Sequence, residues 1–198
     1  TQGSGKSYSM VFLAQKIRRQ FTGSPTFVIL TDRDELNKQI SDTFEACGCL
    51  SGKARQYIPS SGAKLYEMLR GNPSFIFTLI QKFNDENAAP ITPDHDIIIL
   101  SDEAHRSQVN LEQQVRITEN GVQRHYGFAK YLHDSLPNAT YVGFTGTPID
   151  ATIDVFGSVV ERYTMTESVK DGITVNLVYE GRAAKVTLDE DKLEEIEA

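Results

Sequence analysis

The chain has 198 residues, of which 39% are hydrophobic and 24% are charged, a composition typical of a soluble globular domain. No apolar run is long enough to cross a membrane and no signal peptide is visible, so we expect no membrane partner and a cytoplasmic location. The net charge of −7 at first disfavours a nucleic-acid partner, but residues 189–198 carry six acids and one lysine, which leaves −2 elsewhere.

The chain opens on a glycine-rich stretch, and residues with helical apolar spacing follow it to about Gln20. Glycines there let successive backbone N–H groups face one anion, and the start of a helix adds positive potential. In the P-loop pattern G-x-x-x-x-G-K-[ST], the lysine reaches the β- and γ-phosphates and the hydroxyl coordinates Mg²⁺. We therefore predict a nucleotide site at Gly3, Ser4, Gly5, Lys6 and Ser7.

This motif taken alone leaves an alternative open, because a flexible helix cap explains the same residues. The first glycine of the pattern would fall one residue before Thr1. We therefore expect the strand that feeds the loop to lie outside the sequence.

Residues 26–30 form a second apolar run of strand length, and a helical pattern follows. Asp32 or Asp34 is the expected N-cap of that helix. A solvent-exposed helix face is the simpler interpretation of Arg33 and Lys38, while their position at the end of a strand keeps a phosphate role open.

The middle of the chain continues the alternation of helix and strand. Cys47 and Cys49 have no partner residues for a zinc site, so we expect reduced thiols. Residues 64–70 have the pattern of a short helix and residues 74–80 that of a third strand, and a polar loop follows over residues 84–96. Strands separated by helices, without two-residue hairpin turns, indicate βαβ units and a parallel sheet.

Four consecutive branched apolar residues at 97–100 predict a strand buried on both faces. Asp102 and Glu103 follow it, at the end of a strand where open α/β sheets bind ligands. If a nucleotide is present, Asp102 holds Mg²⁺ and Glu103 orients or deprotonates the attacking water. Without a phosphate loop, a surface carboxylate pair would be the simpler interpretation, and His105 is open to interpretation as a hydrogen-bonded bystander.

The next segments complete the predicted sheet. Residues 106–124 are polar and predict an exposed loop or insertion, and residues 126–136 have helical spacing. Residues 139–144 predict a fourth buried strand, which brings Thr145 and Thr147 to the same edge. Two hydroxyls there would be able to sense the γ-phosphate, although a plain β-turn explains the neighbouring glycine and proline equally well.

The last part of the chain reads as a linker that leaves the sheet. Residues 157–163 and 173–179 have the pattern of extended segments, and the sequence turns hydrophilic from Arg182 onward. We expect no second complete domain here.

Taken together, the motifs resemble those of superfamily 2 helicase motors, and most closely the motor (R) subunit of type I restriction enzymes. The resemblance is carried by Gly3-Ser4-Gly5-Lys6-Ser7, Thr31-Asp32-Arg33, Gln81-Lys82-Phe83, Asp102-Glu103-Ala104-His105 and Gly143-Phe144-Thr145-Gly146-Thr147-Pro148. Its more specific parts are Arg106-Ser107-Gln108, Pro137-Asn138-Ala139, Val169-Lys170-Asp171-Gly172 and Tyr179-Glu180-Gly181-Arg182.

The resemblance implies an α/β fold of the RecA-like P-loop NTPase type, with three layers (αβα) and a mostly parallel sheet. Residues 1–165 would form the first motor domain without its N-terminal strand, and residues 166–198 a linker and the beginning of a second motor domain. The implied cofactors are ATP and Mg²⁺. The implied partners are double-stranded DNA and the methylation and specificity subunits of a type I restriction complex.

The resemblance also implies roles for single residues. Thr31, Arg33 and Gln81 would lie near the DNA path, whereas His105, Thr145 and Thr147 would couple the nucleotide state to movement. Arginines of a second motor domain stabilise the transferring phosphate, so we expect poor ATP turnover from these residues alone, and DNA cleavage from a region outside them. Two alternatives stay open: a strand-separating helicase of DNA repair or RNA metabolism, and a non-catalytic nucleotide-binding assembly module.

Overall fold

The structure is a computed structural model, and its chain forms two compact units, Thr1–Tyr163 and Thr164–Ala198. Each unit is described by itself. The residues described are 5–83, 89–91, 93, 95–104, 114–118, 121–125, 128–148, 150–176 and 180.

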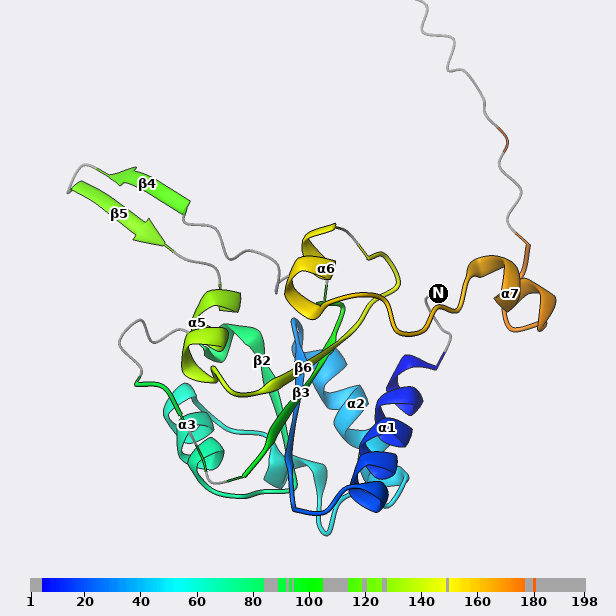
Figure 1. The fold of residues 1–198 in the computed structure, drawn as a ribbon, viewed down its shortest axis with the longest axis horizontal. Coiled ribbons are helices and arrows are strands. Elements are labelled where there is room, and N and C mark those ends of the chain that lie inside the picture. Colours follow the sequence, from blue (N-terminus) through cyan, green and yellow to red (C-terminus); the bar gives the residue numbers. More distant parts are fainter. Residues whose placement is uncertain are drawn as a thin grey trace, which may run out of the picture. The chain divides into compact units, whose positions relative to one another are not determined.

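The first unit alternates strands and helices along the chain (Figure 1). Its helices are α1 (Lys6–Gln20), α2 (Asp34–Ala46), α3 (Gly62–Arg70), α5 (Phe128–Ser135) and α6 (Asp150–Phe156), with single 3₁₀ turns at Ala54–Tyr57 and Ile80–Lys82. Its strands are β1 (Thr26–Thr31), β2 (Phe75–Leu79), β3 (Ile97–Asp102), β4 (Gln114–Thr118), β5 (Gly121–His125) and β6 (Thr140–Phe144).

Four of these strands form one parallel sheet in the order β2-β1-β3-β6. Thr31 pairs with Leu79, and Asp102 pairs with Phe144. The carboxyl ends of all four strands therefore meet at one edge of the sheet. The parallel sheet and its flanking helices confirm the predicted α/β fold of the RecA-like P-loop type.

Two apolar clusters, one on each face of the sheet, give the unit its three layers. Alternate residues of β1 point to opposite faces: Val28 and Leu30 pack with α3 and α5, whereas Phe27 and Ile29 pack with α1 and α2. All six residues of β1 are buried. This double burial explains why the inner strands are continuous apolar runs rather than alternating ones.

The polar segment that we expected to be an exposed loop or insertion, residues 106–124, contains a hairpin in its described part. Strands β4 and β5 pair antiparallel, with Thr118 opposite Gly121. The sequence of β4 alternates apolar and polar residues, as in Val115 and Ile117, and this period of two was the missed signal. The hairpin agrees with an insertion and excludes a loop throughout.

The expectation of a fourth buried strand is correct in position but wrong in burial. β6 lies at the edge of the four-stranded sheet, and its residues are half-buried or exposed. The other edge strand, β2, is buried over its first four residues, so the edge position alone does not account for the exposure of β6.

One local expectation, the N-cap of α2, also needs correction. α2 begins after Arg33, which makes no side-chain capping bond, so neither Asp32 nor Asp34 is the N-cap. The chain has no strand in residues 157–163 or in the described residues 173–176. The second unit instead contains the helix α7 (Met165–Lys170), whose N-cap Thr164 forms a capping box with Glu167.

Candidate functional site

The glycine-rich start of α1 has the backbone of an anion-binding turn. Gly5 is the N-cap, with φ of 82°, a left-handed conformation that glycine adopts without steric cost. Helix α1 then begins at Lys6, and its first turn carries no acidic residue. The positive end of the helix is thus left for an anion, while Gly3 and Ser4 lie outside the described residues.

The acidic pair lies at the carboxyl end of β3. Asp102 is the last residue of the strand and is 8% exposed. Glu103 follows with φ of 47°, which makes it the one non-glycine residue with positive φ in the described part of the chain. A left-handed glutamate costs about 1–2 kcal/mol, so the surrounding structure holds this turn against a local preference.

The two segments meet, although 97 positions separate them in the sequence. Lys6 Nζ donates to Glu103 Oε1 at 2.5 Å and lies 3.9 Å from Asp102 Oδ1. The predicted convergence of Lys6 and Asp102 at one edge of the sheet is therefore confirmed. Their functional roles stay predictions.

Burial dominates the electrostatics of Asp102. It raises the pKa of the Asp102 carboxyl above its ordinary value; the charge of Lys6 opposes this shift, and the charges of Glu103 and Asp32 add to it. Asp102 Oδ1 is also buried without a hydrogen-bond partner. A carboxylate oxygen in that state has capacity for a cation or a water molecule.

These residues fit a nucleotide with its metal ion. Lys6, the Ser7 hydroxyl and the helix start supply groups for phosphates, and Asp102 supplies an oxygen ligand of the kind that Mg²⁺ prefers. In the described part of the chain, no three His, Cys, Asp or Glu side chains are arranged to hold a metal. Mg²⁺ commonly binds through one or two carboxylates together with substrate phosphates, so one such ligand is enough.

The residues predicted near a DNA path lie where β1 and β2 end. Gln81 Nε2 donates to the backbone oxygen of Asp32 at 3.0 Å, which joins the two segments. Arg33 and Gln81 are exposed, whereas Thr31 is fully buried and its hydroxyl donates to the Arg33 backbone oxygen at 3.4 Å. Arg33 and Gln81 thus lie at the surface, whereas the Thr31 side chain lies inside the turn.

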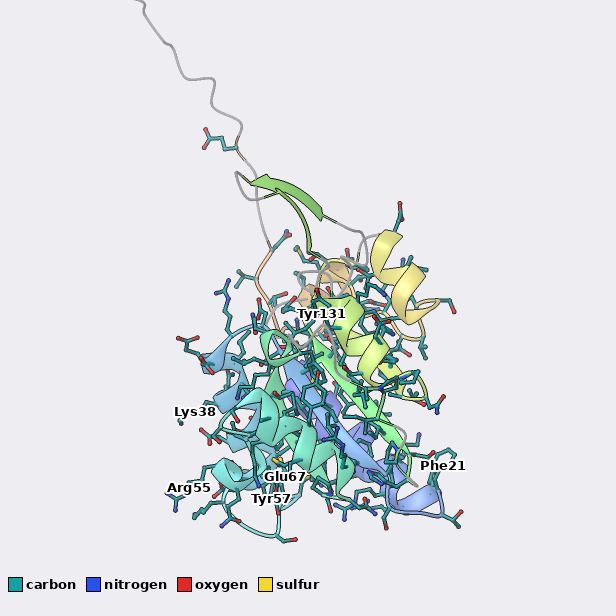
Figure 2. The ribbon with its side chains drawn as sticks, turned by 90° about the vertical axis from the view of Figure 1, so that its left-hand side faces the viewer. Phe21, Lys38, Arg55, Tyr57, Glu67 and Tyr131 are labelled. Atoms are coloured by element: carbon teal, nitrogen blue, oxygen red, sulfur yellow. The ribbon has the colours of Figure 1, made fainter. Side chains whose placement is uncertain are left out.

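The solvent-exposed interpretation holds for Lys38. Its side chain is 77% exposed, pairs with Asp42 on the same helix at 2.8 Å and lies on the outer side of α2 (Figure 2). Cys47 and Cys49 are free thiols, as expected. None of these groups takes part in the convergence around Lys6.

The two threonines after β6 lie beside the acidic turn, because Phe144 pairs with Asp102. The Thr147 backbone N–H donates to Thr145 Oγ1 at 3.1 Å, so the Thr145 hydroxyl also closes a local turn. Thr145 is half-buried and Thr147 is exposed. His105 lies outside the described residues.

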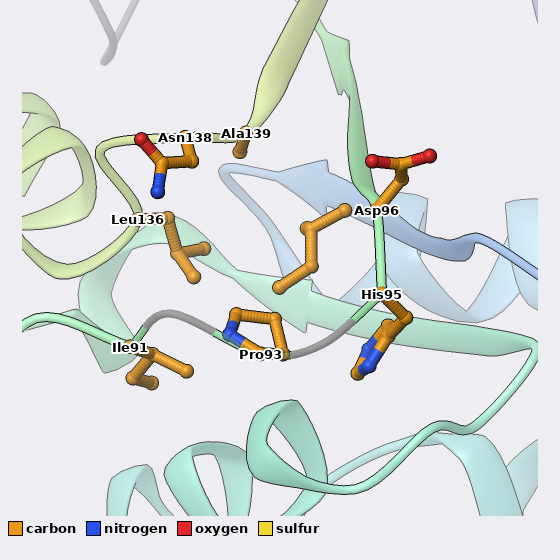
Figure 3. Close-up of a pocket in the computed structure, with 8 residues that line it drawn as sticks. Ile91, Pro93, His95, Asp96, Leu136, Asn138 and Ala139 are labelled. Carbon is orange, nitrogen blue, oxygen red and sulfur yellow. The ribbon is translucent and has the colours of Figure 1, made fainter.

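A pocket of about 290 Å³ lies at the opposite end of the sheet, near the starts of β3 and β6 (Figure 3). It is lined by Ile91, Pro93, His95, Asp96, Ile97, Leu136, Asn138 and Ala139. None of the predicted site residues borders it. The candidate site is therefore defined by converging charges and not by this pocket.

Sequence reasoning missed two features of the site. It assigned no function to Asp32, whose Oδ1 is buried without a hydrogen-bond partner, and it did not anticipate the left-handed backbone of Glu103. No sequence signal marks a left-handed glutamate. The position of Asp32 directly after an apolar strand was the signal for the first.

The fold and the Gly-Lys-Ser helix start beside an acidic strand end define a RecA-like P-loop domain. Residues 1–198 match the SWI2/SNF2 ATPase family over their whole length. The chain belongs to this family.

The chain is also similar to subunits of restriction enzymes. It is 41% identical over 191 residues to the type I restriction enzyme HindI endonuclease subunit of Haemophilus influenzae, covering 91% of this chain and 18% of that protein. It is 34% identical over 198 residues to the putative type I restriction enzyme MjaIXP endonuclease subunit of Methanocaldococcus jannaschii, covering 94% of this chain and 17% of that protein.

These names agree with the resemblance seen in the motifs. The chain spans under a fifth of the length of these two relatives. Among the helices of the described residues, none has the length and apolar character needed to cross a bilayer.

Proposed function

We propose that residues 1–165 act in ATP hydrolysis as the first motor domain of a type I restriction enzyme endonuclease subunit that moves along double-stranded DNA. The observation that carries the proposal is the convergence of Lys6 with Glu103 at 2.5 Å and with Asp102 at 3.9 Å. The SWI2/SNF2 ATPase family supports ATP as the nucleotide, and the names of the relatives support the restriction system.

In this proposal, each group at the edge of the sheet has one task. The turn of Gly3, Ser4 and Gly5 holds phosphates together with Lys6 and Ser7, and Ser7 and Asp102 hold Mg²⁺. Mg²⁺ bound with ATP supplies neutralisation of the charge on the β- and γ-phosphates.

Glu103 is the proposed general base, because its carboxylate lies at the phosphate-binding edge beside Lys6. It orients the attacking water and takes its proton. The left-handed turn holds the Glu103 carboxylate on the side of Lys6 while Asp102 stays buried at the end of the strand. The two adjacent acids thus act on different partners.

The exposed Arg33 and Gln81 are proposed to face DNA, with Thr31 as support within the same turn. Their contact with Asp32 supports a connection to the nucleotide edge, since Gln81 bonds the Asp32 backbone at 3.0 Å. His105, Thr145 and Thr147 are proposed to couple the nucleotide state to movement, and the Phe144–Asp102 pairing supports this for the two threonines.

We further propose that the first motor domain covers residues 1–165 and that residues 166–198 form a linker and the beginning of a second motor domain. The change of compact unit after Tyr163 supports this division. The proposed partners are double-stranded DNA and the methylation and specificity subunits of a type I restriction complex, and the proposed location is the cytoplasm.

The test is the ATPase rate of the full-length protein with Glu103→Gln. ATP binding should survive while hydrolysis falls roughly a hundredfold or more, since a general base contributes that much. Glu67→Gln is a matched control, because Glu67 also accepts from a lysine, at 2.6 Å, but on an exposed helix face. Equal rates for the two variants would remove Glu103 from the mechanism.

Movement along DNA is tested separately from strand separation. The full-length protein should displace a triplex-forming strand from duplex DNA in an ATP-dependent way, without unwinding the duplex. Unwinding would favour the helicase alternative. ATP binding without DNA-stimulated hydrolysis would favour the non-catalytic module.

A further inference from the structure

Asp32 is a carboxylate that the proposed ATP chemistry does not use. It directly follows β1, and its side chain is only 14% exposed. Its Oδ1 atom is buried without a hydrogen-bond partner, and the residue does not cap α2. Leaving a carboxylate oxygen buried without a hydrogen bond costs free energy, so we expect a hydrogen-bond donor or a cation near Asp32 Oδ1.

Asp32 and Asp102 end neighbouring strands at the same edge. The register of β1 and β3 aligns Leu30 with Ser101, which brings the two acids close together. Asp102 is 8% exposed, and its Oδ1 atom also lacks a hydrogen-bond partner. Two adjacent carboxylates thus each have an unsatisfied, buried oxygen.

The nearby positive charges do not neutralise this pair. Lys6 Nζ lies 2.5 Å from Glu103 but 3.9 Å from Asp102, so its short contact goes to a third acid. Arg33 Nε lies 3.8 Å from Asp32 Oδ2, and the Arg33 side chain is 60% exposed, so solvent screens its charge. Like charges this close repel, and a divalent cation would relieve the repulsion.

The chemistry of the edge favours an indirect contact with such a cation. The described side chains include no set of three His, Cys, Asp or Glu residues arranged to hold a bare ion. Mg²⁺ dehydrates reluctantly and keeps several water ligands. A carboxylate one layer behind the direct ligand can accept hydrogen bonds from those waters.

We propose that Asp32 is a positioning residue for the divalent cation of the candidate nucleotide site, accepting hydrogen bonds from the cation's water shell beside Asp102. The inference rests on the proposed function and adds a residue to it. The hydrogen bond from Gln81 Nε2 to the Asp32 backbone oxygen, at 3.0 Å, anchors the residue from β2 and fixes its place at the edge.

The test uses Mn²⁺ as a paramagnetic substitute for Mg²⁺ and measures its affinity for the ATP-bound full-length protein by electron paramagnetic resonance. Asp32→Asn should weaken Mn²⁺ binding roughly tenfold, the usual loss when a carboxylate behind the metal ligands is removed. The affinity for ATP without metal should stay unchanged. Asp34→Asn is the matched control, because Asp34 is exposed two residues away and should change neither affinity.

A kinetic measurement separates positioning from a structural role. Asp32→Asn should raise the Mg²⁺ concentration needed for half-maximal ATPase activity and leave the rate at saturating Mg²⁺ nearly unchanged. Asp32→Glu keeps the charge and should bind Mn²⁺ with most of the wild-type affinity. If Asp32→Asn does not fold, Asp32→Glu is the variant that tests the inference.

Two results would overturn the inference. One is equal Mn²⁺ affinity for Asp32→Asn and Asp34→Asn, and the other is an equal loss of ATP affinity with and without metal. Failure of the proposed function is distinguishable, because the wild-type protein would then either not bind ATP or bind it without DNA-stimulated hydrolysis.

Discussion

The two ends of the parallel sheet differ in kind. At the carboxyl end, Lys6 Nζ lies within 4 Å of carboxylate oxygens of both Asp102 and Glu103, and buried oxygens of Asp32 and Asp102 lack hydrogen bonds. At the amino end, the pocket of about 290 Å³ is lined by apolar residues together with His95, Asp96 and Asn138, and Leu136 is nearly inaccessible. The carboxyl end gathers charged side chains of the candidate site, whereas none of the predicted site residues lines the pocket at the amino end.

This difference indicates where charged functional groups lie in a parallel α/β sheet. Burying an unpaired charge inside the layers is costly, so charged residues gather where the strands end. At the carboxyl end, the start of α1 adds the positive end of a helix. The comparison predicts that substitutions at the two ends separate stability from nucleotide binding.

The largest effect on stability is expected at the pocket end. Leu136 is 1% exposed, and Leu136→Ala should lower the free energy of unfolding by about 2–5 kcal/mol, because the truncation leaves a cavity. Chemical denaturation measures this loss, with Leu136→Met as the volume-conserving control. ATP affinity of the folded variant should not change, and a large change would contradict the separation of the two ends.

The largest effect on nucleotide binding is expected at the carboxyl end. Lys6→Ala should weaken ATP binding by about ten- to a hundredfold, since hydrogen bonds to charged groups contribute about 1.5–3 kcal/mol. Titration with a fluorescent ATP analogue measures the loss. Lys16→Ala is the control, because Lys16 is an exposed residue of the same helix. Equal affinities for the two variants would refute the phosphate role of Lys6.

A smaller effect tests the strained turn at that end. Glu103→Gly and Glu103→Ala both remove the carboxylate, but only glycine tolerates φ of 47° without cost. The glycine variant should therefore be more stable than the alanine variant by about 1 kcal/mol in thermal or chemical denaturation. Equal stability would mean that the turn relaxes when the carboxylate is lost.

The smallest effect is a pH dependence near the start of β6. His133 stacks on Tyr141 with ring centroids 4.1 Å apart, and burial lowers the pKa of His133 below its ordinary value, against the charge of Asp134. The unfolded chain therefore binds a proton more readily than the folded one. The stabilising contribution of neutral His133 is present above the pKa that His133 has in the unfolded chain. It is lost as the pH falls through the lower pKa that His133 has in the folded protein.

Thermal denaturation at pH 8 and pH 5.5 measures this contribution. The wild-type protein should lose stability on acidification, and His133→Phe, which keeps an aromatic ring against Tyr141, should lose less. An unchanged difference between wild type and variant at the two pH values would exclude His133 as the source.

Much of the sheet could be predicted from the sequence because its inner strands are continuous apolar runs. Residues 27–30 and 97–100 are apolar on both faces, which predicts strands that are covered on both faces. The strand β6 has similar residues with much less burial, although the other edge strand, β2, is buried. Burial depends on which elements cover the two faces of a strand, and this information is not local in the sequence.

The candidate site was predictable in its members but not in its pairing. Spacing placed Lys6 and Asp102 at one edge of the sheet, which the 3.9 Å contact confirms. It did not indicate that Lys6 makes its short contact with Glu103, because that depends on the left-handed backbone of Glu103. Individual hydrogen bonds depend on such details of the backbone, which the sequence does not show. The ends of the strands can be predicted from where apolar runs stop.

The pairing of Lys6 with Glu103 links anion binding at this edge of the sheet to the contacts of the Glu103 carboxylate. One ammonium group has three protons to donate and a single charge, so an arriving anion that attracts it competes directly with the carboxylate. An anion that draws the ammonium away would remove Lys6 as a partner of the Glu103 carboxylate. If Glu103 is the general base, as proposed, anion binding at Lys6 and release of the Glu103 carboxylate from Lys6 would be one event.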